Sequence, residues 1–183
     1  MILESNTIFF RLVELNDASF ILGLRKDSTY NKYLSNVSDS INAQNEWLTE
    51  YKKREKISAE FYFIICLNNE KTPIGTVRIY DFKKDSNSFC WGSWILNENK
   101  TKYAALESAL LIYDFAFDKL RFAQCHMNIR KNNEKVITFH KRFGVEIVGE
   151  TELDLLGLYK KETYISIRSS VQSVITDYLQ SNK

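Results

Sequence analysis

The 183-residue chain contains little proline and glycine, with one proline and six glycines. These residues mark hinges and flexible linkers between domains, and no stretch of the chain collects them. Internal repeats and low-complexity segments are missing as well. We therefore expect one compact domain, which a chain of this length fits.

Cysteine is also scarce. Cys66, Cys90 and Cys125 form an odd-numbered set, none of them is part of a Cys-x-x-Cys spacing, and each lies in an apolar segment. This pattern predicts buried thiols in a reducing compartment and argues against a zinc site. We therefore expect no metal cofactor.

The chain lacks both a strong excess of one charge and a long apolar run. The 25 Lys and Arg residues against 23 Asp and Glu residues leave a net charge of +2, which is not a nucleic-acid-binding signature. We find no run of about 18 apolar residues and no basic N-terminal segment leading into an apolar one. We expect a cytoplasmic protein that binds neither nucleic acid nor membrane.

What the chain has is a large share of apolar residues, 44%, and of aromatic residues, 14%, in periodic segments. Alternation predicts strands at residues 7–13, 61–67, 73–81, 89–96, 122–129, 145–153 and 160–168. Helical spacing and caps predict helices at residues 16–26, 39–54, 103–119, 133–143 and 169–179, with a polar linker at 27–37. This order predicts an α/β fold with a mixed sheet and helices on both faces.

Residues 89–144 contain a strand, a polar hinge at 97–102 and then an amphipathic helix. A helix that starts just after a strand presents unpaired backbone N–H groups and the positive end of its dipole. Such an end suits a pyrophosphate. Lys100 and Lys102 add positive charge at the same point. The sequence therefore predicts an anion-binding helix N-terminus.

A more specific pattern follows downstream. The segment Asn133-x-x-Val136-x-x-x-His140-x-x-x-Gly144 resembles the Asn-x-x-small-x-x-x-Tyr-x-x-x-Gly pattern of the GCN5-related N-acetyltransferase (GNAT) superfamily. Glycine at the last position can end a helix in a left-handed conformation.

Other segments extend this resemblance over about residues 8–167. Residues 10–22 resemble the opening strand and first helix of the superfamily, and residues 74–80 resemble its third strand. Trp91-Gly-Ser-Trp-Ile95 is similar to the fourth strand of the branch that acylates amino groups on nucleotide-linked sugars. The resemblance implies an acyltransferase domain at residues 1–168 and a helical tail at 169–183.

The resemblance also implies a twisted mixed sheet of six or seven strands, in which the fourth and fifth strands splay apart to admit the cofactor. These two strands are residues 89–96 and 122–129. The implied co-substrate is acetyl-CoA or another acyl-CoA.

The implied CoA site runs along one strand end, the hinge and the start of the next helix. The expected contacts are Ile95, Leu96, Asn97, Lys100, Lys102, Tyr103, Ala104, Ala105, Leu106 and Asn133. One departure stands out. The usual loop Gln/Arg-x-x-Gly-x-Gly/Ala reads Lys100-Thr-Lys-Tyr103-Ala-Ala105 here, with tyrosine where glycine lets the backbone approach the phosphates.

The resemblance assigns catalytic roles to Asn133 and His140. Asn133 is expected to hydrogen-bond the pantetheine arm, and it is also a good helix cap. His140 stands where relatives carry the tyrosine that protonates the thiolate, a role that imidazole can fill near neutral pH. A lone histidine on an apolar helix face is equally often a core residue. His126 is a weaker candidate for the cleft, and no general base is evident.

Candidate acceptor-binding residues are basic or aromatic: Arg25, Tyr30, Arg78, Tyr80, Trp91 and Trp94. Strict strand alternation places Trp91 and Trp94, three positions apart, on opposite faces. Arg78 projects from a central strand and needs either a ligand phosphate or an acidic side chain such as Asp81.

We therefore expect an acyl-CoA-dependent N-acyltransferase that acts on the amino group of an amino sugar linked to UDP or dTDP, by direct attack in a ternary complex. Two alternatives stay open: transfer to the N-terminal amine of a ribosomal protein, and a non-catalytic CoA-binding domain suggested by the altered loop. The apolar stripe of the tail (Val171, Val174, Ile175 and Leu179) either packs on the domain or forms a dimer contact, so monomer and homodimer are both open.

Overall fold

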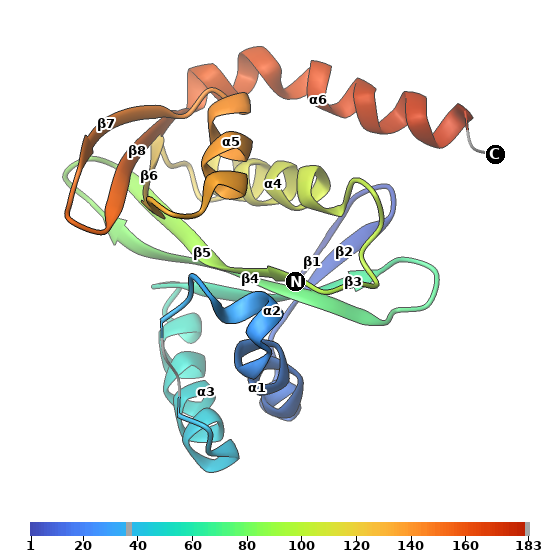
Figure 1. Ribbon diagram of the computed structural model, residues 1–183, viewed down its shortest axis with the longest axis vertical. Helices are drawn as coiled ribbons and strands as arrows, with labels where there is room; N and C mark the ends of the chain where they lie inside the picture. The colour runs from blue at the N-terminus through green and yellow to red at the C-terminus, as the bar shows by residue number, and fades with distance from the viewer. Residues whose placement is uncertain (36–37, 182–183) are drawn as a thin grey trace. The chain divides into compact units, whose positions relative to one another are not determined.

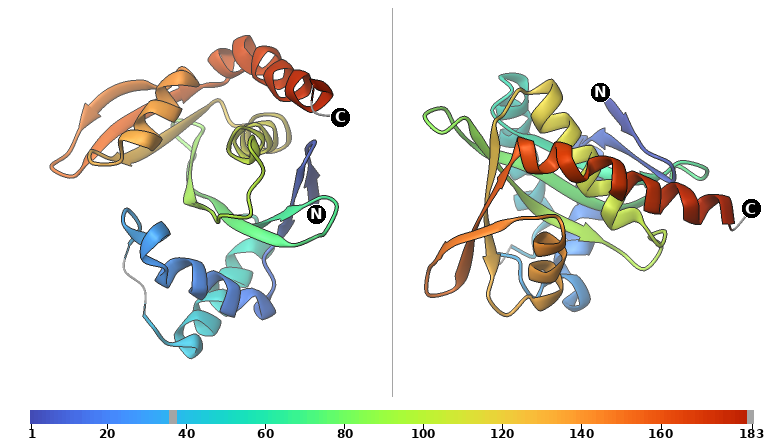
Figure 2. Two further views of the ribbon diagram at one scale, coloured as in Figure 1. Left: turned by 45° about the vertical axis from the view of Figure 1, so that its right-hand side comes forward. Right: turned by 90° about the horizontal axis from the view of Figure 1, so that it is seen from above.

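The computed structural model describes residues 1–35 and 38–181, which form two compact units (Figures 1 and 2). Unit 1 comprises Met1–Asp81 and Trp91–Ala105, and unit 2 comprises Phe82–Cys90 and Leu106–Lys183. Strand β4 (Pro73–Lys83), strand β5 (Ser88–Leu96) and helix α4 (Ala104–Asp114) therefore each contribute residues to both units.

Unit 1 is a set of antiparallel strands with helices inserted after the second strand. Its elements are β1 (Ile2–Glu4), β2 (Ile8–Leu12), the 3-10 turn η1 (Leu15–Asp17), α1 (Ala18–Lys26), α2 (Ser28–Asn31), α3 (Ile41–Lys56), β3 (Phe61–Leu67), β4 (Pro73–Lys83) and β5 (Ser88–Leu96). In the sheet, Phe10 of β2 lies opposite Ile65 of β3, and Tyr62 of β3 lies opposite Arg78 of β4.

The caps of the helices in unit 1 explain where they begin. Ser40 Oγ accepts a hydrogen bond from Ala43 N–H, so α3 starts where the sequence predicted. Asp27 Oδ1 accepts from Thr29 N–H and starts the short helix α2 inside the predicted linker. The end of that linker, residues 36–37, lies outside the described residues.

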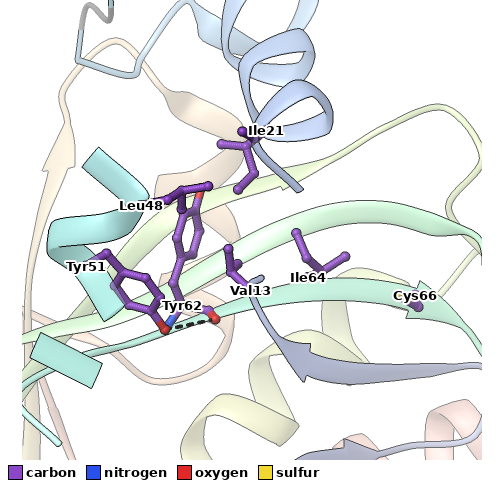
Figure 3. Packing of buried hydrophobic residues seen from close by; sticks show 8 residues of the cluster. Val13, Ile21, Leu48, Tyr51, Tyr62, Ile64 and Cys66 are labelled. Carbon is purple, nitrogen blue, oxygen red and sulfur yellow. Dashed lines mark hydrogen bonds between the residues drawn. The ribbon is translucent and has the colours of Figure 1, made fainter. Parts of the chain in front are cut away.

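The core of unit 1 forms where α1 and α3 cover the strands (Figure 3). Its buried members are Val13, Ala18, Ile21, Leu48, Tyr51, Tyr62, Ile64 and Cys66. Tyr62 N–H donates to Tyr51 OH at 2.7 Å, which ties α3 to β3. Every residue of β3 from Phe61 to Cys66 is buried, as expected for a central strand.

Strand β5 departs from regular alternation at Ser93. Ser93 has a φ of +49°, a left-handed conformation that interrupts the pleat as a β-bulge does. Trp91 and Trp94 consequently contact each other, with ring centroids 5.2 Å apart. The prediction that the two rings lie on opposite faces is wrong, because it assumed an uninterrupted strand.

Unit 2 contains the remaining strands and three helices. Its elements are the first residues of β5, most of α4 (Ala104–Asp114), the π-helical turn η2 (Phe115–Lys119), β6 (Gln124–Arg130), α5 (Glu134–Arg142), β7 (Glu146–Glu150), β8 (Asp154–Lys160) and α6 (Lys161–Ser181). Strand β5 pairs in parallel with β6 at Ser88↔Gln124 and Phe89↔Cys125, and β6 pairs antiparallel with β8, as β8 does with β7.

The predicted mixed α/β architecture is confirmed, although the strand count is higher than expected. The order is β1-β2-β3-β4-β5 in unit 1 and β5-β6-β8-β7 in unit 2, so the described part of the chain has eight strands rather than six or seven. Two of these strands were not predicted from the sequence: β1, and β8, of which only Lys160 falls in a predicted strand. The splay predicted between residues 89–96 and 122–129 stays a prediction.

One predicted strand, residues 160–168, is wrong, because α6 begins at Lys161. The Tyr164 OH donates to Asp114 Oδ1 at 2.6 Å, and Arg168, one helical turn later, donates to both carboxylate oxygens of Asp114. This i, i+4 pair fastens α6 along α4 (Figure 2). Ile175 of the predicted tail is fully buried by its own chain, whereas Val174 is exposed. The predicted boundary at residue 168 falls inside this helix.

The predicted burial of the cysteines is confirmed. Cys66, Cys90 and Cys125 are all buried, and no disulfide joins them. Across residues 1–35 and 38–181, no group of three or more His, Cys, Asp and Glu residues is arranged to hold a metal ion. Within the same residues, none of the helices combines the length and apolar character needed to cross a bilayer.

Candidate active site

The end of β5 presents a backbone edge in unit 1. Asn97 N–H donates to Ile74 O at 2.8 Å, and a Cβ atom at Gly75 would lie 2.1 Å from Ile95 O, so Asn97 and Ile95 both turn their backbone toward β4. Because backbone groups alternate along a strand, the N–H and C=O of Leu96 face away from β4. Of the three expected CoA contacts at this strand end, Ile95, Leu96 and Asn97, Leu96 is therefore the one with its backbone directed to the outer edge.

The hinge after β5 is folded by its own hydrogen bonds. Asn99 N–H donates to Asn97 Oδ1 at 3.1 Å, and Lys100 N–H donates to Asn97 O at 3.2 Å. The hydroxyls of Thr101 and Thr7 are 2.7 Å apart, which ties the hinge to the segment before β2. The hinge is thus a defined turn and not a loose loop.

Tyr30, a predicted acceptor residue, contacts this hinge. Its hydroxyl donates to the Glu98 carboxylate and accepts from Glu98 N–H at 3.2 Å. The hydrogen bond to Glu98 raises the pKa of Tyr30, and the same bond lowers the pKa of Glu98. A cavity of about 250 Å³ lies beside the pair, with Phe20, Asp27 and Asn97 in its lining. Tyr30 therefore links α2 to the segment that precedes α4.

Helix α4 begins at Ala104, where the sequence predicted an anion-binding N-terminus. Ala105 and Leu106 complete the start of its first turn, in which Glu107 is fully buried. The negative charge of a carboxylate this close to the helix N-terminus interacts favourably with the helix dipole, as the charge of a bound anion would. Ala104 is fully buried and its N–H donates to Thr101 O at 3.2 Å, whereas Ala105 is partly exposed. The role of this helix start as a pyrophosphate site stays a prediction.

The two lysines of the hinge are exposed. Lys102 Nζ lies 5.3 Å from the centroid of the Tyr103 ring. This cation-aromatic contact holds the Lys102 ammonium near the helix start, because its favourable energy offsets part of the conformational entropy that the long side chain loses. Tyr103 thus occupies the usual glycine position with its ring beside a cation.

We expect the double variant Lys100→Ala, Lys102→Ala to weaken CoA binding by roughly tenfold at low ionic strength, because each exposed cation near an anion contributes up to about 1 kcal/mol. The loss should shrink at high salt, which screens exposed charges. Calorimetry at two salt concentrations measures both effects. Lys56→Ala, an exposed cation in α3, is the control. An equal loss at both salt concentrations would argue against an electrostatic role.

Helix α5 in unit 2 carries the two predicted catalytic residues. Asn133 is its N-cap, with Oδ1 accepting from Val136 N–H at 3.3 Å. The carbonyl oxygen of this side chain therefore serves the helix, and its NH₂ group is the donor that suits a pantetheine carbonyl. His140 follows after seven residues, about 10 Å along the helix axis. Gly144, with a φ of +87°, closes the helix end as predicted.

His140 is buried, with 6% of its surface exposed. This burial lowers its pKa to about 4, because a charged imidazolium is poorly solvated inside the protein. The side chain is therefore neutral at pH 7. His140 lies in α5, where the imidazole was predicted to replace the phenol of relatives. At pH 7, however, it is a neutral ring whose N–H can donate a hydrogen bond, and not an imidazolium.

His126 lies on β6 beside the start of β5. Its Nδ1 is 2.8 Å from Ser88 Oγ, which in turn is 2.8 Å from Ser86 Oγ. This contact lies where β5 and β6 pair, so it joins the two strands and orients the imidazole. Ser88 was not predicted as a site residue, because the pairing of residues 38 positions apart leaves no local signal in the sequence.

On the acceptor side, unit 1 brings Arg78 and Tyr80 together. The guanidinium carbon of Arg78 lies 4.2 Å from the Tyr80 ring centroid. Arg25, in the last turn of α1, donates to Ser35 O at 2.9 Å and to Ser35 Oγ at 3.0 Å. Trp91 is buried, which favours a packing role for this ring.

Two further residues of this region were missed from the sequence. Trp47 of α3 is 36% exposed, and its ring centroid lies 5.6 Å from the Arg78 guanidinium. The acidic side chain beside Arg78 is Glu60, at 3.9 Å. Trp47 and Arg54 are seven residues apart on one helix face, a spacing that hinted at their contact.

A comparison with protein families identifies the chain. A family model described as the acetyltransferase (GNAT) domain matches residues 7–146. The chain belongs to the GNAT acetyltransferase family. It is therefore an acyl-CoA-dependent N-acetyltransferase, as the sequence predicted.

Solved structures confirm the predicted GNAT fold. FdhC, described as a nucleotide-linked sugar GNAT in its apo form, is 45% identical, with 93% of this chain and 96% of that chain covered and a TM-score of 0.86. The ribosomal-protein-S5-alanine acetyltransferase from Vibrio fischeri is 18% identical (88% and 97% covered, TM-score 0.75). Spermidine N-acetyltransferase from Vibrio cholerae, in complex with CoA and spermine, is 19% identical (86% and 98% covered, TM-score 0.72). The last two show the fold alone. A search of curated proteins gave no match.

Proposed function

We propose that this GNAT enzyme transfers an acetyl or slightly larger acyl group from acyl-CoA to the amino group of an amino sugar carried by UDP or dTDP. The observation that carries the proposal is the 45% identity, over 93% of the chain, to a nucleotide-linked sugar GNAT. The guanidinium groups around Arg78 support it, because the phosphates of a nucleotide need positive partners.

The proposed reaction is a direct attack in a ternary complex. The amine nitrogen bonds to the acyl carbon while the carbon–sulfur bond breaks, the nitrogen loses a proton, and the sulfur leaves as a thiolate that takes one up. In unit 1, the outer backbone edge of Leu96 is the proposed contact for the pantetheine arm. In unit 2, the Asn133 NH₂ group is the proposed donor to a pantetheine carbonyl. His140, as a neutral ring, donates a hydrogen bond to the departing sulfur.

The decisive test is a product assay with acetyl-CoA and a panel of amines, read by thiol release and by mass spectrometry. The panel contains UDP- and dTDP-linked amino sugars, the same sugars without the nucleotide, a peptide with a free N-terminal amine, and spermidine. We expect acylation of at least one nucleotide-linked amino sugar, with a kcat/KM well above that of the free sugar.

Exclusive acylation of the peptide or of spermidine would overturn the proposal. The alternative of transfer to a ribosomal-protein N-terminus has less support, since the relative with that activity is 18% identical. Heat-denatured enzyme and an assay without amine are the controls, because thioesters hydrolyse slowly on their own.

A further inference from the structure

Arg25 of α1 and Arg78 of β4 converge over one buried phenol in unit 1. The register of β3 and β4 places Arg78 directly opposite Tyr62, so both side chains share a face of the sheet. Burial raises the pKa of Tyr62, while the charges of Arg25 and Arg78 both act to lower it. Two guanidiniums therefore lie close enough to act on a single hydroxyl.

Among the described residues, Arg25 has no ion pair, and Arg78 has one that it shares. The one carboxylate in the cluster is Glu60, which is 8% exposed and is shared between Arg54 at 2.8 Å and Arg78 at 3.9 Å. Arg54 and Arg78 thus share one carboxylate, and Arg25, which lies close enough to Arg78 to feel its charge, adds a third guanidinium to the cluster. Burial lowers the pKa of Arg25, and the neighbouring charge of Arg78 lowers it further, although Tyr62 opposes both effects.

The hydrogen-bonding capacity of the pair is also incomplete. Within residues 1–35 and 38–181, the buried Nε atoms of Arg25 and Arg78 have no hydrogen-bond partner. A buried guanidinium N–H without an acceptor carries the full cost of its desolvation. An incoming anion with several oxygens would satisfy these donors and relieve the repulsion between the two charges.

Aromatic rings hold Arg78 in place. Its guanidinium lies 4.2 Å from the Tyr80 ring centroid and 5.6 Å from that of Trp47, and Arg54 lies 5.6 Å from the same Trp47 ring. Stacking on ring faces leaves the N–H edge of a guanidinium available to a ligand. The exposed fractions of the Arg78 side chain, 21%, and of Trp47, 36%, show that solvent reaches this cluster.

We propose that Arg25 and Arg78 form the diphosphate-binding site for the nucleotide that carries the acceptor sugar. This inference rests on the proposed function. Arg25, Arg54 and Arg78 carry three positive charges, of which Glu60 offsets one. The remaining two match a sugar-linked diphosphate, which carries one negative charge on each phosphate. The planar fork of arginine matches phosphate oxygens in pairs, which a compact ammonium does not.

The test measures the binding of UDP, dTDP and the nucleosides uridine and thymidine by calorimetry. In wild type, the nucleoside diphosphates should bind at least tenfold more tightly than the nucleosides. Arg25→Gln and the charge-preserving Arg78→Lys should each weaken UDP or dTDP binding at least tenfold, with nucleoside and CoA binding changed less than twofold. Lys53→Gln, an exposed cation paired with Glu50, is the matched control and should change nothing. Thermal melts show that each variant is folded.

The outcomes separate this site from the proposed function. Turnover of a nucleotide-linked amino sugar with an unchanged KM in both arginine variants overturns the diphosphate site and leaves the function standing. Weaker UDP binding in the variants without turnover of any nucleotide-linked sugar overturns the function and leaves the site standing. A loss of CoA affinity equal to the loss of UDP affinity assigns the pair to the cofactor and overturns the inference.

Discussion

Gly75→Ala is expected to destabilise the protein by about 3 kcal/mol or more, because a methyl group there would lie 2.1 Å from the backbone oxygen of Ile95. A flexible side chain could move aside at small cost, but a carbonyl inside a strand cannot. Strands β4 and β5 would have to separate, and the hydrogen bond from Asn97 N–H to Ile74 O lies next to the point of strain.

Gly75→Ala should also displace the backbone at the proposed cofactor site. Leu96 follows Ile95 directly, and its backbone forms the proposed pantetheine edge. A displacement of about 1 Å in such an edge can lower the rate on the order of a hundredfold. We therefore expect CoA binding and turnover to fall more than the loss of folded protein explains.

Gly23→Ala is the matched control for this prediction. Gly23 lies in the interior of α1, and a Cβ atom there meets nothing within 4 Å. Alanine is the better helix former, so this variant should gain about 0.5–1 kcal/mol. Urea unfolding of both variants, with CoA titration of the folded proteins, gives the comparison. A Gly75→Ala protein as stable as wild type would show that β4 and β5 are not this close.

Features with a local cause were predictable from the sequence. Strand β3 has the predicted bounds, Ser40 starts α3, Asn133 caps α5, and Gly144 takes the left-handed conformation. Each depends on a residue and its next few neighbours along the chain. The start of α4 after a polar hinge belongs to the same class, whereas the cofactor contacts expected there stay a prediction.

Features that depend on distant contacts were not predictable. The residue in the left-handed conformation is Ser93 and not a glycine or asparagine, so the contact between Trp91 and Trp94 was missed. Apolar and polar residues alternate over residues 160–168, as they do in a strand. The segment is nevertheless helical, because Tyr164 and Arg168 both bind Asp114, which lies 50 or more positions away in the sequence. The pairing of Arg78 with Glu60 likewise comes from strand register.

Stability is expected to fall as the pH drops from 6.5 to 4, in part because of His140. Its pKa is about 4 in the folded protein against an ordinary value of 6.5. Between these two values the unfolded chain binds a proton that the folded protein does not. The free energy of unfolding therefore rises with pH across this window, by up to about 3 kcal/mol from this residue, and the contribution is complete above pH 6.5.

His140→Phe removes the titrating group and keeps a ring of similar size in its buried place. Its unfolding free energy should change less than that of wild type between pH 6.5 and 4, by the same amount of about 3 kcal/mol. His126→Gln removes the other histidine, which is only partly buried, and serves as the control. Chemical unfolding at a series of pH values measures all three proteins, and the carboxylates common to them cancel in the comparison.

The same pair of variants tests what the neutral ring does in catalysis. At pH 7 only about one molecule in a thousand carries a His140 imidazolium, so proton donation from that species would be slow. A hydrogen bond from the neutral ring predicts that kcat does not decline from pH 5.5 to 7.5 through this residue. It also predicts that His140→Phe lowers kcat more than it raises the KM for acetyl-CoA. A kcat that drops tenfold per pH unit above pH 4 in wild type, and not in the variant, would assign the role to the imidazolium instead.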